Sequence, residues 1–404
     1  MMKVLLVSHY LPPSRYGQPR VIQRLLQGFP AETYALASVE TYDRSQARSD
    51  QDGPWLLGDY IHLRKLDWLN RILIRRPLAP YARLLGALPE IWFRTGQIAK
   101  LIRERRSGVT IACSGDIADL PAAWLASKRT GCAFIPYMFD DYVEQWAFQP
   151  RLRRLAAALE RRFIANAAKV IVPNEFLRRE YQERYGLGDK LVVINNPWLS
   201  DVSPPSGEAV RRDGPKKIVY TGSIYHVHFD AFVTLGQALG LLDCTATLDI
   251  YSATPAETLT ANGLDRFVHH GHVDDKTSAA VQRDADILFL PLAFQSSAQA
   301  VIRTSAPGKM GEYLSSGRPL LIHAPADSYI AWYGREHDCA EVVTERDPAT
   351  LAAAIQRLLT QPDHVAKLVA NAKARAQADF SPEVAATRFA QTLACVSSQS
   401  GSRA

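Results

Sequence analysis

Short apolar runs recur through the first half of the chain and predict parallel β-strands. The first run, residues 3–10, is apolar through its middle and is followed by Pro12 and Pro13, which is typical of a strand covered on both faces. Helical stretches such as residues 151–168 separate the later runs, so we expect a doubly wound parallel sheet of the α/β class. The other predicted strands are residues 34–39, 109–113, 133–138, 169–172 and 190–194.

A segment rich in Pro, Ser, Gly and Asp, residues 195–215, interrupts this pattern and predicts a domain boundary. Residues 216–223 then resemble the opening of the chain. We therefore expect two Rossmann-like domains, residues 1–205 and residues 206–380. Residues 381–404 are expected to form a helix that returns toward the first domain and ends in a tail that is frayed from Ser397. The strands predicted for the second domain are residues 246–251, 268–270, 287–290, 319–323 and 341–343.

Length and composition agree with two globular domains. A chain of 404 residues is too long for one ordinary core, and 47% hydrophobic with 22% charged residues excludes general disorder. No apolar stretch approaches the roughly 18 residues that suggest a membrane span, and the N-terminus lacks the apolar core of a signal peptide, so we expect a cytoplasmic protein. The five cysteines show no CxxC spacing and predict neither a disulfide framework nor a zinc site.

The net charge of +6 is unevenly distributed. Residues 64–106 hold eleven Lys or Arg against three acidic residues, which indicates one attractive patch for anions rather than a nucleic-acid-binding protein. Apolar residues such as Trp68 and Trp92 are interleaved with basic ones such as Arg75 and Arg94, a pattern typical of surfaces that meet anionic lipid. Helices with an apolar face in the core and a solvated basic face are the alternative.

The stretch from residue 305 to residue 322 carries the most informative chemistry. It predicts a loop, a short helix and a strand, and the loop brings Ser305, Gly308 and Lys309 to the start of the helix. Backbone N–H groups and a lysine at such a position suit a diphosphate. Glu312 lies three residues beyond Lys309, where a carboxylate can accept hydrogen bonds from ribose hydroxyls. From the spacing alone, an ordinary loop with a surface Lys–Glu pair is equally compatible.

This segment resembles the nucleotide-sugar signature of the retaining GT-B glycosyltransferases of family 4, the glycosyltransferase group 1 type. In that signature a Glu is followed by an apolar turn, small residues, Gly and Pro, and here Glu312 precedes Tyr313-Leu-Ser-Ser-Gly-Arg-Pro319. The resemblance implies the GT-B architecture, in which two Rossmann-like domains face a central cleft. Further matching pieces, in the family's order, are His9-Tyr-Leu-Pro-Pro, Tyr220-Thr-Gly-Ser223, His270-Gly-His-Val273 and Asp284-Ala-Asp-Ile-Leu-Phe-Leu-Pro291.

The resemblance also implies an activity. A hexosyltransferase-like enzyme would move a sugar from a nucleotide-diphosphate sugar to an acceptor hydroxyl, with retention, without a metal and without a further cofactor. The acceptor would be a saccharide or a lipid-linked sugar in bacterial cell-surface polysaccharide or glycolipid assembly, with peripheral attachment to the inner face of the plasma membrane through residues 64–106. The donor-binding residues would be Gly222, Ser223, His226, His272, Val273, Thr304, Ser305, Gly308, Lys309 and Glu312.

Two departures from the family pattern concern the donor phosphates and sugar. Family members commonly carry two glutamates eight positions apart, and Thr304 stands where the first is expected. Ser223 and Phe229 occupy the places of the Arg and Lys that usually grip the diphosphate. We therefore expect Lys309 to balance more of the negative charge of the diphosphate and to act as a catalytic residue. These departures leave open an altered donor or a non-catalytic GT-B subunit.

In the first domain, two predicted strands end in acidic residues. Asp116 and Asp140 follow strands whose carboxyl ends should meet at one edge of the sheet, so both are candidate catalytic groups as general base or acceptor contact. Each could instead only cap the helix that follows. His9 and a loop with Gly17 and Arg20 end the first strand and are expected to reach the sugar or diphosphate.

Two other enzyme classes share the two-domain α/β build. A nucleotide-sugar epimerase remains an alternative, although the order of the motifs fits transfer better. A dehydrogenase is disfavoured, because its first strand should run into G-x-G-x-x-G, whereas Ser8-His-Tyr-Leu-Pro-Pro follows the strand here.

Overall fold

The chain forms two compact units. The computed structural model describes residues 3–45, 48, 51, 53–66, 82–198, 214–296 and 298–401. The first unit consists of residues 1–195 with residues 385–404, and the second of residues 196–384. The break after Asn195 lies at the start of the Pro-rich segment, ten residues before the boundary predicted at residue 205, and residues 199–213 of that segment lie outside the described part.

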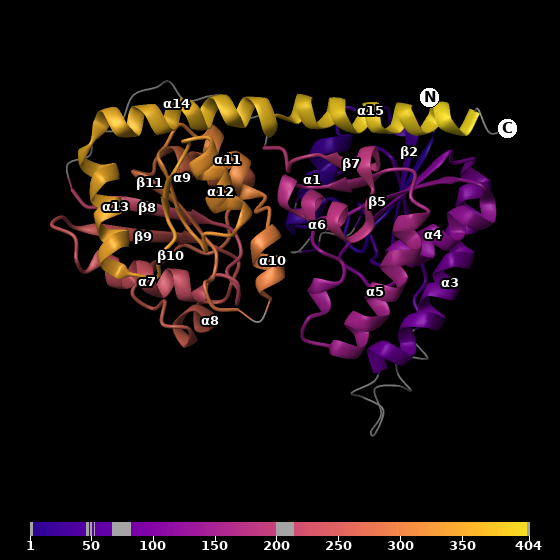
Figure 1. Ribbon diagram of the computed structural model, residues 1–404, viewed down its shortest axis with the longest axis horizontal. Coiled ribbons are helices and arrows are strands. Elements are labelled where there is room, and N and C mark those ends of the chain that lie inside the picture. Colours follow the sequence, from indigo (N-terminus) through magenta and orange to yellow (C-terminus); the bar gives the residue numbers. More distant parts are fainter. Residues whose placement is uncertain are drawn as a thin grey trace. The chain divides into compact units, whose positions relative to one another are not determined.

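The first unit contains one parallel sheet of seven strands, in the order β3-β2-β1-β4-β5-β6-β7. Helices cover the sheet on both faces (Figure 1), so the predicted doubly wound arrangement is confirmed. The strands are β1 (Val4–Val7), β2 (Tyr34–Ser38), β3 (Asp59–His62), β4 (Val109–Cys113), β5 (Ala133–Tyr137), β6 (Val170–Val172) and β7 (Leu191–Val193). The helices are α1 (Gly17–Leu26), α3 (Ala82–Arg105), α4 (Asp119–Thr130), α5 (Pro150–Ala165), α6 (Glu175–Tyr185) and the part of α15 (Pro382–Gly401) that belongs to this unit.

The continuous apolar runs follow from burial on both faces of the sheet. Along β1, Leu5 and Val7 pack into the cluster that α3, α4, α5 and α6 cover. Val4 and Leu6 point the other way, into the cluster that α1 and α15 cover. Because successive side chains of a strand alternate between the faces, every position of such a strand must be apolar.

Strand β3 was not predicted. It lies at the edge of the sheet, and both of its terminal residues, Asp59 and His62, are exposed. An edge strand buries only part of its surface, so its sequence lacks the apolar run by which the other strands were recognised.

The second unit also contains one parallel sheet, in the order β10-β9-β8-β11-β12-β13. Both faces are buried, because Ile218 and Tyr220 of β8 join the cluster with α7, α8, α13 and α14, while Val219 between them is buried as well. The strands are β8 (Lys216–Thr221), β9 (Ala246–Tyr251), β10 (Val268–His269), β11 (Ile287–Pro291), β12 (Leu320–His323) and β13 (Glu341–Val343). The helices are α7 (Phe229–Leu239), α8 (Ala256–Ala261), α9 (Asp275–Arg283), α10 (Gln299–Thr304), α11 (Lys309–Ser315), α12 (Tyr329–Glu336), α13 (Pro348–Thr360) and α14 (Pro362–Asp379).

The C-terminal helix α15 carries the chain back to the first unit. Ala385, Phe389, Leu393 and Val396 form its buried stripe, at the spacing of an amphipathic helix, and pack into the core beside α1. The helix continues to Gly401, so the tail expected to fray from Ser397 is helical up to that residue.

Replacement of Phe389 by Ala is expected to destabilise the first unit by about 3–5 kcal/mol. The ring is 1% exposed and packs edge-on against Phe29, with the centroids 5.7 Å apart, so truncation leaves a cavity. The free energy of unfolding in urea measures the effect. Gln391→Ala, at an exposed position of the same helix, is the matched control, and equal stability of the two variants would contradict this packing.

Candidate functional site

Lys309 is the first residue of α11 and reaches the carboxyl end of β8. Its Nζ donates a hydrogen bond to the Tyr220 hydroxyl at 2.5 Å and lies 3.8 Å from the centroid of the same ring. The Tyr220 hydroxyl in turn donates to the Ser223 carbonyl at 2.7 Å. The hydrogen-bond partner of the lysine is thus a phenol rather than a carboxylate.

Gly222 is required beside this lysine for two reasons. Its φ of +114° lies in a region that residues with a side chain rarely adopt. In addition, a Cβ at this position would lie 2.9 Å from Lys309 Nζ. The turn after β8 therefore places a residue without a side chain directly next to Lys309, while the Gly222 amide donates to the Tyr251 carbonyl at 2.8 Å.

Glu312 is held on the next turn of α11. Gln282 of α9 donates from its Nε2 to Glu312 Oε2 at 3.4 Å and to Thr221 Oγ1 at 3.0 Å. The Tyr313 hydroxyl accepts a hydrogen bond from the Thr221 amide at 2.8 Å. These contacts tie α9 and α11 to the end of β8, so Lys309, Glu312 and the Gly222 turn lie close together in the second unit.

Burial controls the electrostatics of this site. It lowers the pKa of Lys309 to about 7, against the opposing effect of Glu312. Burial likewise lowers the pKa of His228, and the nearby Lys309 contributes to that shift. An anion that binds at Lys309 would reverse this effect and favour the charged ammonium, so the site is arranged to accept negative charge.

The other donor-site candidates lie in loops of the second unit. Ser223 and His226 are exposed after β8, while His272 is exposed and Val273 is half-buried between β10 and α9. Ser305 and Gly308 flank the loop that leads from α10 into α11.

Thr304, at the end of α10, is buried. Its hydroxyl donates to the Ala300 carbonyl at 3.1 Å. The Thr304 hydroxyl therefore donates its hydrogen bond within its own helix.

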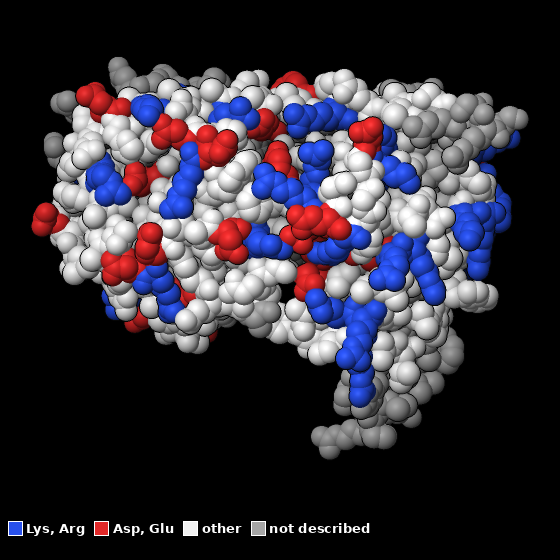
Figure 2. Space-filling view, in the orientation of Figure 1, with Lys and Arg blue, Asp and Glu red and all other residues white. Residues whose placement is uncertain are grey.

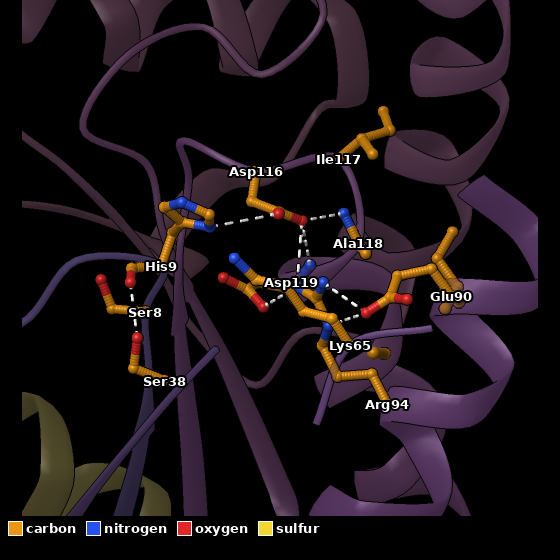
Figure 3. Close-up of polar contacts among 12 residues, drawn as sticks. Ser8, His9, Ser38, Lys65, Glu90, Arg94, Asp116, Ile117, Ala118 and Asp119 are labelled. Carbon is orange, nitrogen blue, oxygen red and sulfur yellow. Dashed lines mark hydrogen bonds and ion pairs between the residues drawn. The ribbon is translucent and has the colours of Figure 1, made fainter. Parts of the chain in front are cut away.

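In the first unit, Asp116 follows β4 and is surrounded by donors (Figure 3). Its Oδ1 accepts hydrogen bonds from the Ala118 amide at 2.5 Å and from Arg94 Nη1 at 3.1 Å, and its Oδ2 lies 3.4 Å from His9 Nδ1. Burial acts to raise the pKa of Asp116, but Arg94 and these hydrogen bonds hold it below its ordinary value. The carboxylate is thus a weak base that accepts hydrogen bonds from the Ala118 and Asp119 amides in the turn before α4, whose N-cap residue is Ala118.

Arg94 is the centre of this cluster. Its side chain is 3% exposed and binds three carboxylates, Glu90 at 2.7 Å, Asp116 at 3.1 Å and Asp119 at 2.5 Å. The assignment of Arg94 to a basic surface facing lipid is therefore wrong, because α3 turns this arginine inward. No sequence spacing connects Arg94 with Asp116, and only the packing of α3 on α4 brings them together.

His9, Asp116 and Asp119 also meet the distance requirement of a metal site. Each offers one ligand atom, and these atoms lie within 4.8 Å of one another. However, the Arg94 guanidinium already contacts both carboxylates and neutralises charge that a metal ion would otherwise balance. We therefore interpret the group as an ion-pair cluster whose resident cation is Arg94.

The cluster borders a pocket of about 490 Å³ in the first unit. One wall is polar and includes His9, Lys65 and Asp116, whereas Trp146 and Leu152 give another wall apolar character. A pocket with both kinds of wall suits a sugar, whose ring faces are apolar and whose rim carries hydroxyls.

The other first-unit candidates that the sequence suggested are Asp140, Gly17 and Arg20. Asp140 is exposed in the loop after β5, where its amide donates to Ser114 Oγ at 3.3 Å. Gly17 and Arg20 were expected in a loop, but both belong to α1. The chain turns into helix directly after Tyr16, so these two residues are part of a regular element.

The sequence did not reveal several residues that hold the Lys309–Glu312 site and the Asp116 cluster together. Tyr220 and Gln282 hold Lys309 and Glu312, and Arg94 and Asp119 surround Asp116. The only available signal was the i, i+4 spacing of Glu90 and Arg94, which favours an ion pair on a helix.

Comparison with known proteins agrees with this geometry. The family described as Glycosyltransferase Family 4 matches residues 16–197, and the family described as Glycosyl transferases group 1 matches residues 215–361. No curated protein matches the chain in sequence.

Solved structures with low identity share the fold over the whole chain. HepE of Anabaena, solved in complex with UDP-glucose, is 15% identical with a TM-score of 0.66, covering 98% of this chain and 100% of its own. Sucrose-phosphate synthase of Thermosynechococcus elongatus is 15% identical with a TM-score of 0.70, covering 99% and 100%. The α,α-trehalose 6-phosphate synthase of Burkholderia multivorans is 14% identical with a TM-score of 0.67, covering 100% of both.

Two parallel α/β units, together with solved structures that share this fold over nearly the whole chain, show the GT-B architecture. With both halves matched by family models, the chain belongs to the family 4, group 1 type of glycosyltransferases. None of the helices among the described residues is both long and apolar enough to span a membrane.

Replacement of Lys309 by Met is expected to stabilise the second unit in a pH-dependent way. The native lysine releases its proton near pH 7, whereas an unfolded lysine does so near 10.5. Between these values the unfolded state binds more protons, so wild-type stability rises with pH. The gain in unfolding free energy should be on the order of 2–4 kcal/mol at pH 6 and should shrink toward pH 10.

Urea unfolding at several pH values measures this difference. Lys276→Met, at an exposed position on α9, is the control and should show a small difference that does not change with pH. A gain for Lys309→Met that stays constant from pH 6 to pH 10 would contradict the burial of the ammonium.

Proposed function

We propose that the protein transfers a sugar from a nucleotide-diphosphate sugar to the hydroxyl of an acceptor, with the donor held in the second unit. The observation that carries this proposal is the Lys309 side chain, held 2.5 Å from the Tyr220 hydroxyl beside Gly222. A lysine beside a residue without a side chain lets a diphosphate approach closely and supplies a charge-assisted hydrogen bond to it. The presence of UDP-glucose in HepE, which shares the fold, supports the same class of donor.

Each part of the donor has a candidate partner. Lys309 and the backbone amide of Ser223 would bind the diphosphate, with Gly222 leaving room for it and Lys309 stabilising the negative charge that develops on the leaving group. Glu312, oriented by Gln282, would accept hydrogen bonds from the ribose hydroxyls. The loop with His272 and Val273 would lie along the base, His226 would lie near the diphosphate, and the segment with Thr304, Ser305 and Gly308 would lie along the sugar and phosphates.

The remaining features of the proposal rest on the family resemblance. They are retention at the anomeric carbon, no requirement for a metal or further cofactor, and a role in bacterial cell-surface polysaccharide or glycolipid assembly on the cytoplasmic side of the membrane. Asp140, exposed after β5, stays a candidate for contact with the acceptor.

A thermal-shift screen with UDP-glucose, UDP-galactose and GDP-mannose tests the donor site. At a ligand concentration of about 100 times Kd, binding should stabilise the protein by about 2.7 kcal/mol. Lys309→Ala should remove this stabilisation, because the diphosphate loses its only direct charge partner in the proposal. Lys276→Ala, an exposed lysine of the same unit, should keep it.

The enzymatic part is tested by release of free UDP or GDP in the presence of a bacterial membrane extract as acceptor source. An equal stabilisation of wild type and Lys309→Ala, or an absence of stabilisation by every nucleotide sugar, would refute the assignment of the donor site.

We further propose that α3 and α5 attach the protein to an anionic membrane surface. Leu85, Leu88 and Trp92 lie on one face of α3 and are 47%, 56% and 68% exposed, which is unusual for large apolar residues grouped together. Helix α5 packs against α3 and carries exposed arginines that include Arg151 and Arg154. On the face drawn in Figure 2, Lys and Arg side chains gather over this part of the first unit.

Part of the basic segment that suggested this surface lies outside the described residues. Residues 67–81, with Arg71, Arg75 and Arg76, are not described, and Arg94 points inward. The proposal therefore rests on the exposed apolar face of α3 beside the arginines of α5.

Flotation with vesicles of phosphatidylcholine, with and without phosphatidylglycerol, tests this surface. The double variant Leu88→Glu with Trp92→Glu should weaken binding to the anionic vesicles at least about tenfold, because it replaces apolar contact with repulsion. Leu241→Glu, at a position 58% exposed in the second unit, should bind like wild type. Unchanged binding of the double variant would contradict the proposed surface.

A further inference from the structure

Another pocket in the first unit, of about 660 Å³, lies at the amino ends of three neighbouring strands. Residues 131–133 lead into β5, residues 165–168 precede β6, and Lys190 precedes β7. Because these strands are parallel and adjacent in the sheet, their amino ends lie along one edge of it. The other residues that line the pocket are Trp124, Ser127 and Lys128 of α4, Phe134 of β5 and Val396 of α15.

This edge of the sheet is opposite to the one that carries the candidate acceptor residues. Asp116 and Asp140 follow the carboxyl ends of β4 and β5, and the five residues of β5 separate those ends from the pocket. Lys309 and Glu312 belong to the other unit. A molecule bound in this pocket is therefore neither the donor nor the acceptor of the proposed reaction.

Two buried polar groups on the wall of the pocket have no hydrogen-bond partner among the described residues. They are Trp124 Nε1 and Ser127 Oγ, on side chains of residues that are 8% and 2% exposed. The two residues are three positions apart on α4, so they lie on the same side of the helix. Buried polar groups in folded proteins are nearly always paired, and a polar ligand in the pocket would pair an indole N–H and a hydroxyl at its wall.

The charged side chains of the pocket all have the same sign. Lys128 and Lys190 line it, and none of the described lining residues is acidic. Neither lysine forms an ion pair with a carboxylate in the part of the chain that the structure describes. Two ammonium groups beside an N–H and an O–H donor suit an anion with several acceptor oxygens, above all a phosphate group.

Hydrogen-bond acceptors occupy the rest of the wall. Helix α4 ends at Thr130 and α5 at Ala165, directly before the loops that line the pocket. The last carbonyls of a helix have no partner within it and carry partial negative charge. Asn166 uses its Nδ2 to donate to the Arg162 carbonyl at 2.8 Å, which leaves its Oδ1 as an acceptor. These groups are poor partners for a bare anion but good partners for hydroxyl groups.

We propose that this pocket binds a phosphorylated sugar, a hexose phosphate monoester, as a ligand that is separate from donor and acceptor. The phosphate lies between Lys128 and Lys190 and accepts a hydrogen bond from Trp124 Nε1. The sugar hydroxyls donate to the carbonyls at the ends of α4 and α5. The pocket volume lies within the range of roughly 300–1,000 Å³ that small-molecule sites have. The inference goes beyond the proposed function and does not depend on it.

Titration calorimetry with glucose 6-phosphate on the full-length protein tests the proposal. Trp124→Phe keeps an aromatic ring and removes the N–H, and the double variant Lys128→Ala with Lys190→Ala removes both ammonium groups. Each should weaken binding at least about tenfold, because each removes charge-assisted contacts to the phosphate. Arg129→Ala is the matched control, since Arg129 is exposed next to Lys128 but does not line the pocket, and it should bind like wild type.

Inorganic phosphate and glucose separate the two halves of the ligand. Each should bind at least about tenfold more weakly than glucose 6-phosphate, because each meets only one part of the wall. Binding of inorganic phosphate as tight as that of glucose 6-phosphate would overturn the assignment of a sugar. Lys309→Ala should bind glucose 6-phosphate like wild type, and loss of binding in this variant would place the ligand in the donor site and overturn the pocket assignment.

A second measurement locates the ligand without a substitution. Cys132 lines the pocket and is half-buried, as is Cys244 in the second unit. Saturating glucose 6-phosphate should slow the reaction of Cys132 with N-ethylmaleimide at least about threefold and leave Cys244 unchanged, as measured by mass spectrometry of peptides. Equal rates for Cys132 with and without the ligand would refute this location.

The proposal and the proposed function fail separately. Absence of glucose 6-phosphate binding to wild type at about 10 mM would refute the hexose phosphate site, whatever the nucleotide sugars do. Absence of binding by every nucleotide sugar would refute the donor site and leave the calorimetric and maleimide results for this pocket unchanged.

Discussion

The parallel sheets, buried on both faces, are the constraint on which the rest of the structure depends. Because helices cover both faces, polar side chains can gather only where strands end and loops begin. Both groups of functional candidates occupy such places. His9 and Asp116 follow the adjacent strands β1 and β4, and Gly222 follows β8, where α11 delivers Lys309.

The two units use buried charge in opposite ways. In the first unit, Arg94 binds three carboxylates at once, so the negative charge of the cluster is largely compensated. In the second unit, Lys309 is held by a phenol, and burial lowers its pKa to about 7. A buried cation whose hydrogen-bond partner is neutral gains most from binding a diphosphate.

Strands buried on both faces were predictable, because an uninterrupted apolar run of four to eight residues between turn-forming residues is typical of them. Strand β9 and strand β4 have the predicted bounds. The edge strand β3 was missed, since its exposed ends Asp59 and His62 break the pattern. Gly17 and Arg20 were placed in a loop although α1 begins at Gly17, because Tyr16 before it offers no side-chain cap that would mark a helix start.

The amino-acid sequence by itself determined the two α/β halves, the segment in which they separate, and the pairing of Lys309 with Glu312 on one short helix, since all of these depend on local spacing. Only the tertiary structure decided that Tyr220 holds Lys309, that Arg94 turns inward to Asp116, and that Asp116 faces His9. These partners lie far apart along the chain, and their contacts follow from how helices pack against strands. Local periodicity carries no information about such contacts, so a residue's chemical type was visible in the sequence while its partner, and with it its role, was not.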